Sequence, residues 1–214
     1  MSFNQELSEQ LKLTLVTSSH EAAPRKIIEL ADLAFAGGVT ALQLREKNIS
    51  DQAFYSEAKE LSAFCRERGK LFIINDRLDI ALAVDASGLH LGQTDLPAEV
   101  AASILPKNKI LGISASSLGI ASAARQAGAD YLGVGAIFPT GSKDDASVIK
   151  TAEARRIIDL GLPTVAIGGI NADNADEVWK IGFTGLAVIS ALSGARHPSQ
   201  IAADLLRAAN SKEL

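Results

Sequence analysis

The feature that most constrains this chain is a regular alternation of short apolar segments with longer stretches of helical spacing. The apolar segments end in Gly, Asn, Asp, Ser or Thr, as strands do before a turn. Strands are predicted over residues 12–17, 40–45, 71–74, 88–91, 110–113, 130–134, 164–167 and 185–188. Helices are predicted over residues 25–36, 52–68, 77–84, 97–104, 117–127, 151–160, 173–181 and 199–209, with a short extra helix over 3–10.

This alternation predicts an α/β fold, a closed (β/α)8 TIM barrel that forms a single domain over residues 1–214. A doubly wound open sheet is the alternative, and it normally carries a glycine fingerprint after its first strand. Here the first strand runs into Thr17, Ser18, Ser19 and His20, and no G-x-G-x-x-G follows, which disfavours the open sheet. Four glycines occupy the position after a helix where a left-handed residue is expected: Gly69, Gly128, Gly161 and Gly182.

Composition narrows the function classes. With 21 basic and 25 acidic side chains, the net charge is −4 and the isoelectric point is near 5.4. A surface of this charge does not attract nucleic acid or an anionic membrane, so small-molecule partners are expected, and a homo-oligomer is left open. Cys65 is the single cysteine, so no intramolecular disulfide can form. Without a signal-like or membrane-spanning run, a cytoplasmic location is expected.

The second predicted strand carries charge where a barrel strand should be apolar. By the two-residue period, Gln43, Arg45 and Lys47 share one face, and Leu42 and Leu44 share the other. If the leucines meet the helices, the polar face points into the mouth of the barrel, where an anionic ligand would compensate the cations. The plainer interpretation is an early strand end with solvated or salt-bridged cations.

Two acidic residues follow the next two strands. Asn75 and Asp76 end the third strand, and Asp95 comes just after the fourth. Adjacent strands lie about 4.8 Å apart, so the two carboxylates can share one Mg²⁺, which typically uses one or two carboxylates together with water and substrate phosphate. Alternatively, Asp76 caps the next helix and Asp95 opens a turn before Pro97.

The segment 133–147 is too long for a minimal turn, which makes it a candidate lid that carries Thr140, Ser142 and Lys143. Its order differs from that of a P-loop, and a loose surface loop is the alternative. The segments 167–170 and 187–190 place glycines and backbone N–H groups where barrels often bind phosphate, although tight packing around glycine explains them equally well.

The remaining polar residues suggest less. The histidines lack metal-ligand spacing and are interpreted as structural or solvated: His20, His90 and His197. Cys65 is expected to be a small buried or half-buried residue. No pattern for a covalent nucleophile is present in the sequence.

Taken together and in order, these motifs resemble those of the thiamine phosphate synthase family. The resemblance runs from the second predicted strand to the eighth. It rests on QLREK at 43–47, ND at 75–76, HLGQTD at 90–95, GIS at 112–114, the T-x-S-K loop at 140–143, GGI at 168–170 and VIS at 188–190.

The resemblance implies an enzyme, a transferase that joins hydroxymethylpyrimidine diphosphate to thiazole phosphate and releases diphosphate. It implies that the diphosphate is bound by Arg45, Lys47, Asn75 and Lys143, with Gln43 and Ser114 beside the same substrate. Arg45, Lys47, Ser114 and Lys143 would be the catalytic residues. It also implies that Asp76 and Asp95 bind Mg²⁺, and that the phosphate of the thiazole is bound by Thr140, Ser142, Gly169, Ile189 and Ser190.

Three positions depart from the family pattern. Ser142 stands where the loop usually has a second threonine, Ser116 where many relatives have a histidine, and Thr14 where the first strand often has a tyrosine. Ser142 keeps a hydroxyl and should be tolerated. The other two departures affect details of pyrimidine binding and leave the reaction class unchanged.

The implied mechanism is loss of diphosphate to give a stabilised pyrimidine cation, followed by attack of the thiazole nitrogen. Two alternatives remain: a thiazole tautomerase, which needs neither diphosphate nor metal, and a non-catalytic barrel that binds a phosphate ligand. The transferase requires one spatial arrangement, in which groups from the second, third, fourth and sixth strands converge at the same end of the barrel.

Overall fold

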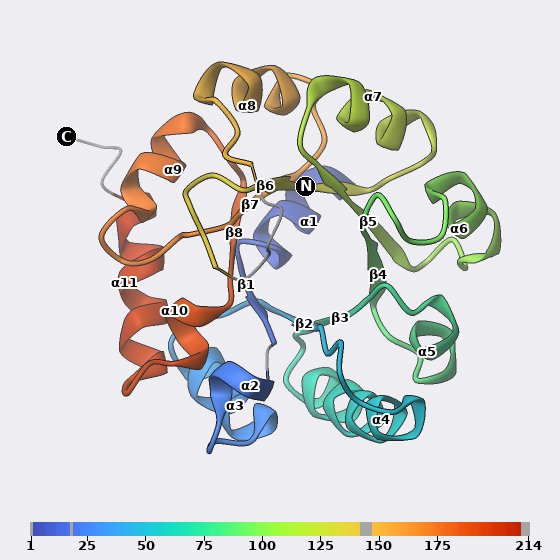
Figure 1. Ribbon diagram of the computed structural model, residues 1–214, viewed down its shortest axis with the longest axis vertical. Coiled ribbons are helices and arrows are strands. Elements are labelled where there is room, and N and C mark those ends of the chain that lie inside the picture. The colour runs from blue at the N-terminus through green and yellow to red at the C-terminus, as the bar shows by residue number, and fades with distance from the viewer. Residues whose placement is uncertain (1, 18, 142–146, 211–214) are drawn as a thin grey trace.

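The computed structural model describes residues 2–17, 19–141 and 147–210, and its centre is a closed barrel of eight parallel strands (Figure 1). Each strand pairs with the next along the chain, and the last pairs with the first, so the sheet has no free edge. The predicted (β/α)8 barrel is confirmed. The strands are β1 (Leu13–Val16), β2 (Ala41–Leu44), β3 (Leu71–Asn75), β4 (Gly88–Leu91), β5 (Ile110–Ala115), β6 (Tyr131–Gly135), β7 (Thr164–Ile167) and β8 (Gly185–Val188).

Helices surround the barrel as an outer ring (Figure 1). None of the helices in the described part of the chain is both long enough and apolar enough to cross a bilayer. The helices are α1 (Phe3–Gln10), α2 (Ser19–Ala22), α3 (Ile27–Ala36), α4 (Asp51–Glu67), α5 (Leu78–Ala83), α6 (Ala98–Ile104), α7 (Leu118–Gln126), α8 (Thr151–Ile158), α9 (Ala175–Ile181), α10 (Ser190–Ser193) and α11 (Pro198–Asn210).

The predicted elements match the observed ones apart from two short helices. α2 and α10 have four residues each, which is too short for a helical period to be visible in the sequence. The four glycines expected after helices all have positive φ, from 61° at Gly69 to 116° at Gly182. The local sequence therefore predicted where the long helices end, because a left-handed residue is most easily supplied by glycine.

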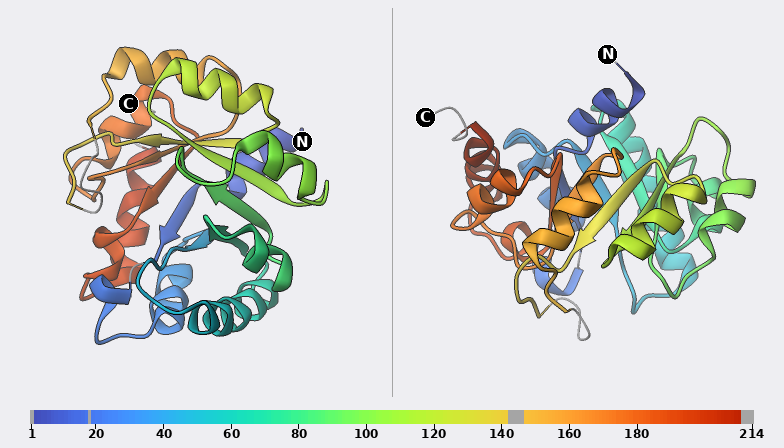
Figure 2. Two further views of the ribbon diagram at one scale, coloured as in Figure 1. Left: turned by 45° about the vertical axis from the view of Figure 1, so that its right-hand side comes forward. Right: turned by 90° about the horizontal axis from the view of Figure 1, so that it is seen from above.

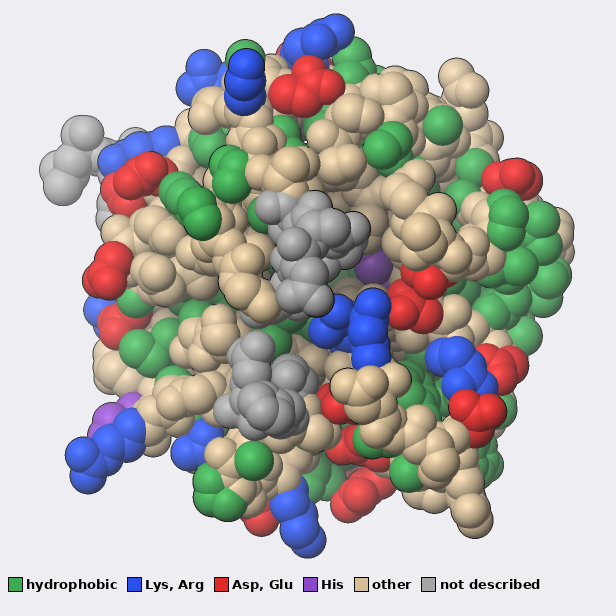
Figure 3. Space-filling model, viewed as in Figure 1, with side chains coloured by type: hydrophobic (Ala, Val, Ile, Leu, Met, Phe, Trp, Pro, Cys, Tyr) green, Lys and Arg blue, Asp and Glu red, His purple; other side chains and the backbone are tan. Residues whose placement is uncertain are grey.

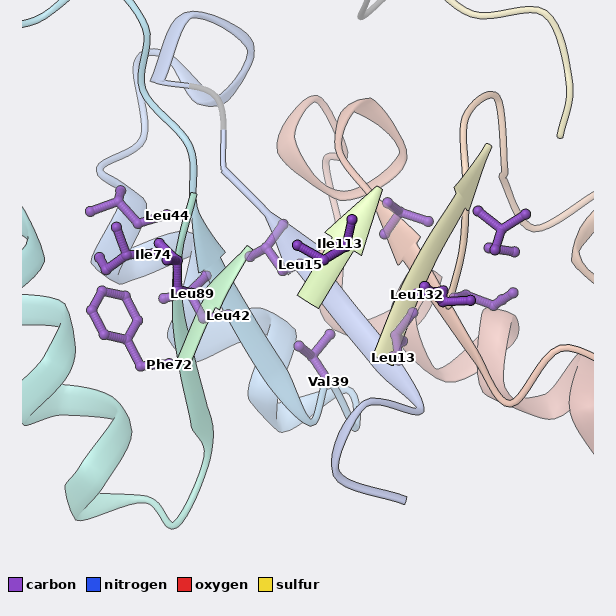
Figure 4. Close-up of a cluster of buried hydrophobic side chains, with 14 of the residues drawn as sticks. Leu13, Leu15, Val39, Leu42, Leu44, Phe72, Ile74, Leu89, Ile113 and Leu132 are labelled. Carbon is purple, nitrogen blue, oxygen red and sulfur yellow. The ribbon is translucent and has the colours of Figure 1, made fainter. Parts of the chain in front are cut away.

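Strand side chains alternate between two hydrophobic cores. Leu42 and Leu44 of β2 belong to the larger core, which lies between the strands and the helices (Figure 4). The alternate positions point into the barrel, as the two-residue period predicts. The smaller core, inside the barrel, consists of Leu7, Leu11, Val16, Ala41, Ile73, Ile110, Tyr131, Val165 and Ala187.

Helix α1 closes one end of the barrel. It begins with a capping box, in which the Ser2 hydroxyl accepts a hydrogen bond from the Gln5 backbone N–H and the Gln5 side chain accepts one from the Ser2 N–H. Leu7 and Leu11 are each 1% exposed and pack among the interior residues. Figure 2 shows α1 at the end of the barrel opposite to the end where the chain leaves β6. The carboxyl ends of the strands therefore form the open mouth, where TIM barrels place their sites.

Candidate active site

Gln43, on the polar face of β2, lies inside the barrel as predicted. Leu42 and Leu44 are fully buried against the helices, whereas Gln43 is 7% exposed within the barrel. Beyond the strand, Arg45 is half-buried and Lys47 is exposed. β2 thus ends before the cations and Lys47 is solvated, as the alternative interpretation expected. The charge of Lys47 nevertheless acts on the acidic pair described below.

Glu46, between Arg45 and Lys47, connects the loop after β2 to the start of α2. Thr17 Oγ1 accepts a hydrogen bond from the Arg45 backbone N–H at 2.8 Å and donates one to Glu46 Oε1 at 3.1 Å. The same Glu46 oxygen accepts a hydrogen bond from the Ser19 N–H at 3.0 Å. Glu46 therefore ties the start of α2 to the loop after β2. Sequence reasoning missed this role, because the partners lie almost thirty residues apart along the chain.

The two acidic residues come together at the mouth. Asp76 has a φ of 65°, and its backbone N–H donates to the His90 carbonyl at 2.9 Å. Burial raises the pKa of the Asp76 carboxyl, and the neighbouring Asp95 raises it further. The positive charges of Lys47 and Arg45 partly oppose this, and the resulting pKa is about 6 instead of 3.8. Groups that follow β2, β3 and β4 therefore act on one another at one end of the barrel.

The sequence also allowed Asp76 to cap a helix and Asp95 to open a turn, and the structure shows only the second of these roles. Asp76 does not cap α5, because the residue at the N-cap position is Arg77 and no side chain bonds there. Asp95 does close a turn, since its Oδ2 accepts a hydrogen bond from the Gly92 N–H at 2.6 Å. The turn orients the Asp95 carboxylate and keeps it beside Asp76.

Figure 3 shows this face of the molecule. Lys and Arg side chains, Asp and Glu side chains and a His side chain gather around the hollow near its centre. The described residues contain no group of three or more His, Cys, Asp or Glu side chains that could hold a metal ion by itself. A pair of carboxylates is nevertheless sufficient for Mg²⁺, which takes its remaining ligands from water and substrate phosphate. The raised pKa of Asp76 is the electrostatic sign of a pair that a cation would stabilise.

A second feature of the same mouth follows β6, β7 and β8. It is a cleft of about 530 Å³. Gly169 has a φ of 66°, and a Cβ atom on it would lie 2.5 Å from the Pro139 carbonyl oxygen. Tight packing around glycine is therefore observed, and the same turn also borders the cleft. The cleft is lined by Pro139, Thr140, Gly141, Gly169, Ile170, Asn171, Ser190 and Ala191.

Some predicted site residues are placed and others lie outside the described chain. Asn75 is half-buried at the end of β3, and its register partner on β4 is His90. Ile189 comes directly before α10. Ser142 and Lys143 lie outside the described residues.

The departures from the family pattern fall in different environments. Thr14 is 2% exposed, and its Oγ1 has no hydrogen-bond partner in the part of the chain that the structure describes. Ser116 is exposed just after β5. A change at Thr14 therefore affects the interior of the barrel, whereas one at Ser116 affects its rim.

A buried polar group beneath the mouth was not predicted as part of the site. His90 is 8% exposed, and its ring nitrogens lie 2.9 Å from Tyr131 Oη and 3.0 Å from Ser114 Oγ. The interpretation of His90 as a structural histidine is confirmed and the solvated alternative is wrong. Its place between Leu89 and Leu91, on the inward side of the two-residue period, was the available sequence signal.

These features define a (β/α)8-barrel protein whose cationic and acidic side chains meet at the carboxyl ends of the strands. The sequence model of the family described as thiamine monophosphate synthase matches residues 13–192. The chain belongs to this family.

Curated relatives agree with this assignment. The chain is 41% identical to a thiamine-phosphate synthase of Methanobrevibacter smithii over 94% of this chain and 97% of the relative. It is 47% identical to one of Pyrococcus furiosus over 88% and 90% of the two chains. A solved structure, thiamine phosphate pyrophosphorylase from Pyrococcus furiosus, superposes with a TM-score of 0.88 at 44% identity and covers 96% of this chain and 98% of its own. These findings support the predicted transferase and give no support to the tautomerase or to the non-catalytic barrel.

Proposed function

We propose that the mouth of the barrel binds hydroxymethylpyrimidine diphosphate and thiazole phosphate side by side and couples them. The activity itself follows from the family: the chain is a transferase that forms thiamine phosphate and releases diphosphate. The observation that carries the assignment of the site is the environment of Asp76, where Asp95, Lys47 and Arg45 all act on one carboxyl group.

In this proposal the cationic side chains at the mouth bind the diphosphate. Arg45 and Lys47 follow β2, Asn75 ends β3, and Lys143 is contributed by the segment after β6. Arginine and lysine donate several hydrogen bonds to phosphate oxygens, and the asparagine amide adds an uncharged donor. The half-buried position of Arg45 supports this role, because a cation held away from water gains most from an anionic ligand.

The residues present fit a magnesium ion. Asp76 and Asp95 would hold it, and two carboxylates leave coordination positions for the substrate's phosphate oxygens. When bound, Mg²⁺ supplies positive charge to the departing diphosphate. Binding of the ion would also relieve the repulsion between the two carboxylates that raises the pKa of Asp76.

The chemistry requires no nucleophile from the protein. The bond between the pyrimidine methylene carbon and the diphosphate oxygen breaks, and the electron pair leaves with the diphosphate. The lone pair of the thiazole nitrogen then forms the new carbon–nitrogen bond. Arg45, Lys47 and Lys143 would stabilise the negative charge that develops on the leaving group.

The other substrate fits the neighbouring cleft. Thr140, Gly169 and Ser190 line this cleft, and hydroxyl and backbone N–H groups of this kind are ordinary phosphate donors. Ser142 and Ile189 complete the proposed phosphate site. Gln43 and Ser114 lie in or beside the barrel interior and would border the pyrimidine.

The protein's setting is also part of the proposal. Small molecules are its expected partners, in keeping with the names of its relatives. A cytoplasmic location is supported by the single cysteine, Cys65, which is buried and cannot form an intramolecular disulfide.

The proposal is tested by measuring thiamine phosphate formation from the two substrates with Mg²⁺ and with EDTA. Lys143→Ala should lose on the order of 10²–10³ in kcat while its thermal unfolding stays unchanged, because one donor to the developing charge is removed. Lys59→Ala, on the exposed surface of α4, is the matched control and should retain full activity. Full turnover in EDTA would contradict the metal assignment, and full turnover of Lys143→Ala would contradict the diphosphate assignment.

A further inference from the structure

A chain of buried polar groups runs across the barrel below the mouth. His90 Nδ1 lies 2.9 Å from Tyr131 Oη, and His90 Nε2 lies 3.0 Å from Ser114 Oγ. On the far side of Tyr131, the Gln43 side chain hydrogen-bonds to the phenol. Tyr131 is 2% exposed and Gln43 is 7% exposed, whereas Ser114 is half-buried. Ser114 is thus the least buried member of this chain of polar groups.

The neighbouring strands leave room for this arrangement. A Cβ atom at Gly112 would lie 2.2 Å from the Tyr131 ring, and one at Gly133 would lie 2.8 Å from the His90 ring. Any larger residue at these two positions would displace the rings. Each ring therefore packs directly against the backbone of a glycine, and this close contact restricts its orientation.

The direction of each hydrogen bond follows from the donors available. The Gln43 side chain hydrogen-bonds to the Tyr131 phenol, and its amide group can donate an N–H to the phenol oxygen. Tyr131 then has its own O–H to donate, and His90 Nδ1 is the acceptor within 2.9 Å.

Burial keeps the imidazole neutral. The His90 side chain has little contact with solvent, and the hydrogen-bond partners of its two ring nitrogens, Tyr131 Oη and Ser114 Oγ, are both uncharged. A neutral imidazole carries one proton, so a nitrogen that accepts at Nδ1 leaves the proton on Nε2. Nε2–H then donates to Ser114 Oγ, and the serine proton is free to point into the site.

We propose that His90 is a positioning residue for the transfer reaction: as the Nε2–H tautomer it holds Ser114 as a hydrogen-bond donor toward the pyrimidine diphosphate. Tyr131 sets the tautomer and Gln43 sets the direction of Tyr131. The inference rests on the proposed function in one respect, the contact of Ser114 with substrate. A preoriented donor contributes most where negative charge develops, so its loss should lower kcat and leave KM unchanged.

The tautomer is measured directly by nitrogen NMR of protein labelled with ¹⁵N-histidine. The chain has three histidines, and the signal of His90 is identified by its loss in His90→Gln. At pH 7 the correlation pattern should show the proton of His90 on Nε2 and not on Nδ1. A proton on Nδ1 in the unmodified protein would overturn the proposal, and this result needs no variant to fold.

Tyr131→Phe tests the consequence for catalysis. It removes the donor to Nδ1, so His90 should shift toward a mixture of tautomers, and kcat should fall about tenfold with KM for the pyrimidine diphosphate unchanged. His90→Gln, which keeps an N–H donor, should retain more activity than His90→Leu. The exposed His197 provides the control, and His197→Gln should leave kcat unchanged.

Different results would contradict the proposed function and the positioning role of His90. No product from the unmodified protein with both substrates would end the proposed function. Normal kcat in Tyr131→Phe, with product forming in the unmodified protein, would overturn only the positioning role of His90.

Discussion

The pair of aspartates at the mouth should lower the stability of the folded protein when no cation is bound to it. The pKa of Asp76 rises from 3.8 to about 6 on folding, because the carboxyl is partly buried and lies beside Asp95. A carboxyl whose pKa is raised in the folded state opposes folding at a pH above the folded value, and this penalty disappears as the pH falls below the unfolded value. Asp76→Asn removes the charge and should therefore stabilise the metal-free protein at pH 7.

The magnitude follows from the shift. A rise from 3.8 to about 6 corresponds to about 3 kcal/mol if the carboxyl is fully shielded from water. Asp76 is only half-buried, so solvent screens much of this, and we expect about 1 kcal/mol. For a chain of this length, that free energy raises Tm by about 2–4 °C. Asparagine is the suitable replacement, because it tolerates the left-handed φ of 65° that alanine would strain.

The assay is thermal unfolding in EDTA at a series of pH values. The gain in Asp76→Asn should be full at pH 7 and should shrink to nothing by about pH 3, below the unfolded pKa of 3.8, where Asp76 is protonated in both states. With Mg²⁺ and diphosphate added, the unmodified protein should gain stability and the variant should gain little. No stabilisation at pH 7, or a gain that persists at pH 3, would refute the electrostatic reasoning.

Asp85 offers a matched control. It also has a positive φ, 53°, but it is exposed and its pKa is lowered by Lys109, with which it forms an ion pair. Asp85→Asn therefore keeps the backbone conformation but removes the attraction to Lys109, whereas Asp76→Asn removes a repulsion. Asp85→Asn should show no gain in Tm at pH 7.

Two further pairs of variants probe the scaffold by chemical denaturation. Leu7→Ala should lower the free energy of unfolding by about 2–5 kcal/mol, because this side chain fills the barrel from α1. Phe3→Ala, on the same helix but 60% exposed, should change it by less than about 0.5 kcal/mol, and equal effects would contradict the closing role of α1. Thr14→Val should stabilise by about 1 kcal/mol, because it removes a buried hydroxyl that lacks a protein partner in the described chain. Thr17→Val should destabilise by about 1–3 kcal/mol, because it breaks the bonds to Arg45 and Glu46, and the opposite order of the two threonine variants would contradict the hydrogen bonds described here.

Local sequence pattern was sufficient for the architecture. Alternating apolar segments and helical stretches predicted all eight strands to within two residues, because burial on both faces imposes a continuous apolar run on a parallel strand. The same period placed Gln43 inside the barrel and Leu42 outside it. A closed parallel barrel brings all carboxyl strand ends together, so the fold prediction alone implied that residues after β2, β3 and β4 would meet.

Tertiary structure decided how those residues act on one another. The pKa of Asp76 depends on its burial and on the approach of Asp95, a residue of another strand's loop, which no local pattern encodes. His90 looked like an isolated histidine in the sequence, because its partners Ser114 and Tyr131 are 24 and 41 residues away. The amino-acid sequence thus determined which elements form and where their polar ends point, since these depend on neighbours along the chain. Charge state, hydrogen-bond direction and closure by α1 depend on distances that exist only once the barrel has formed.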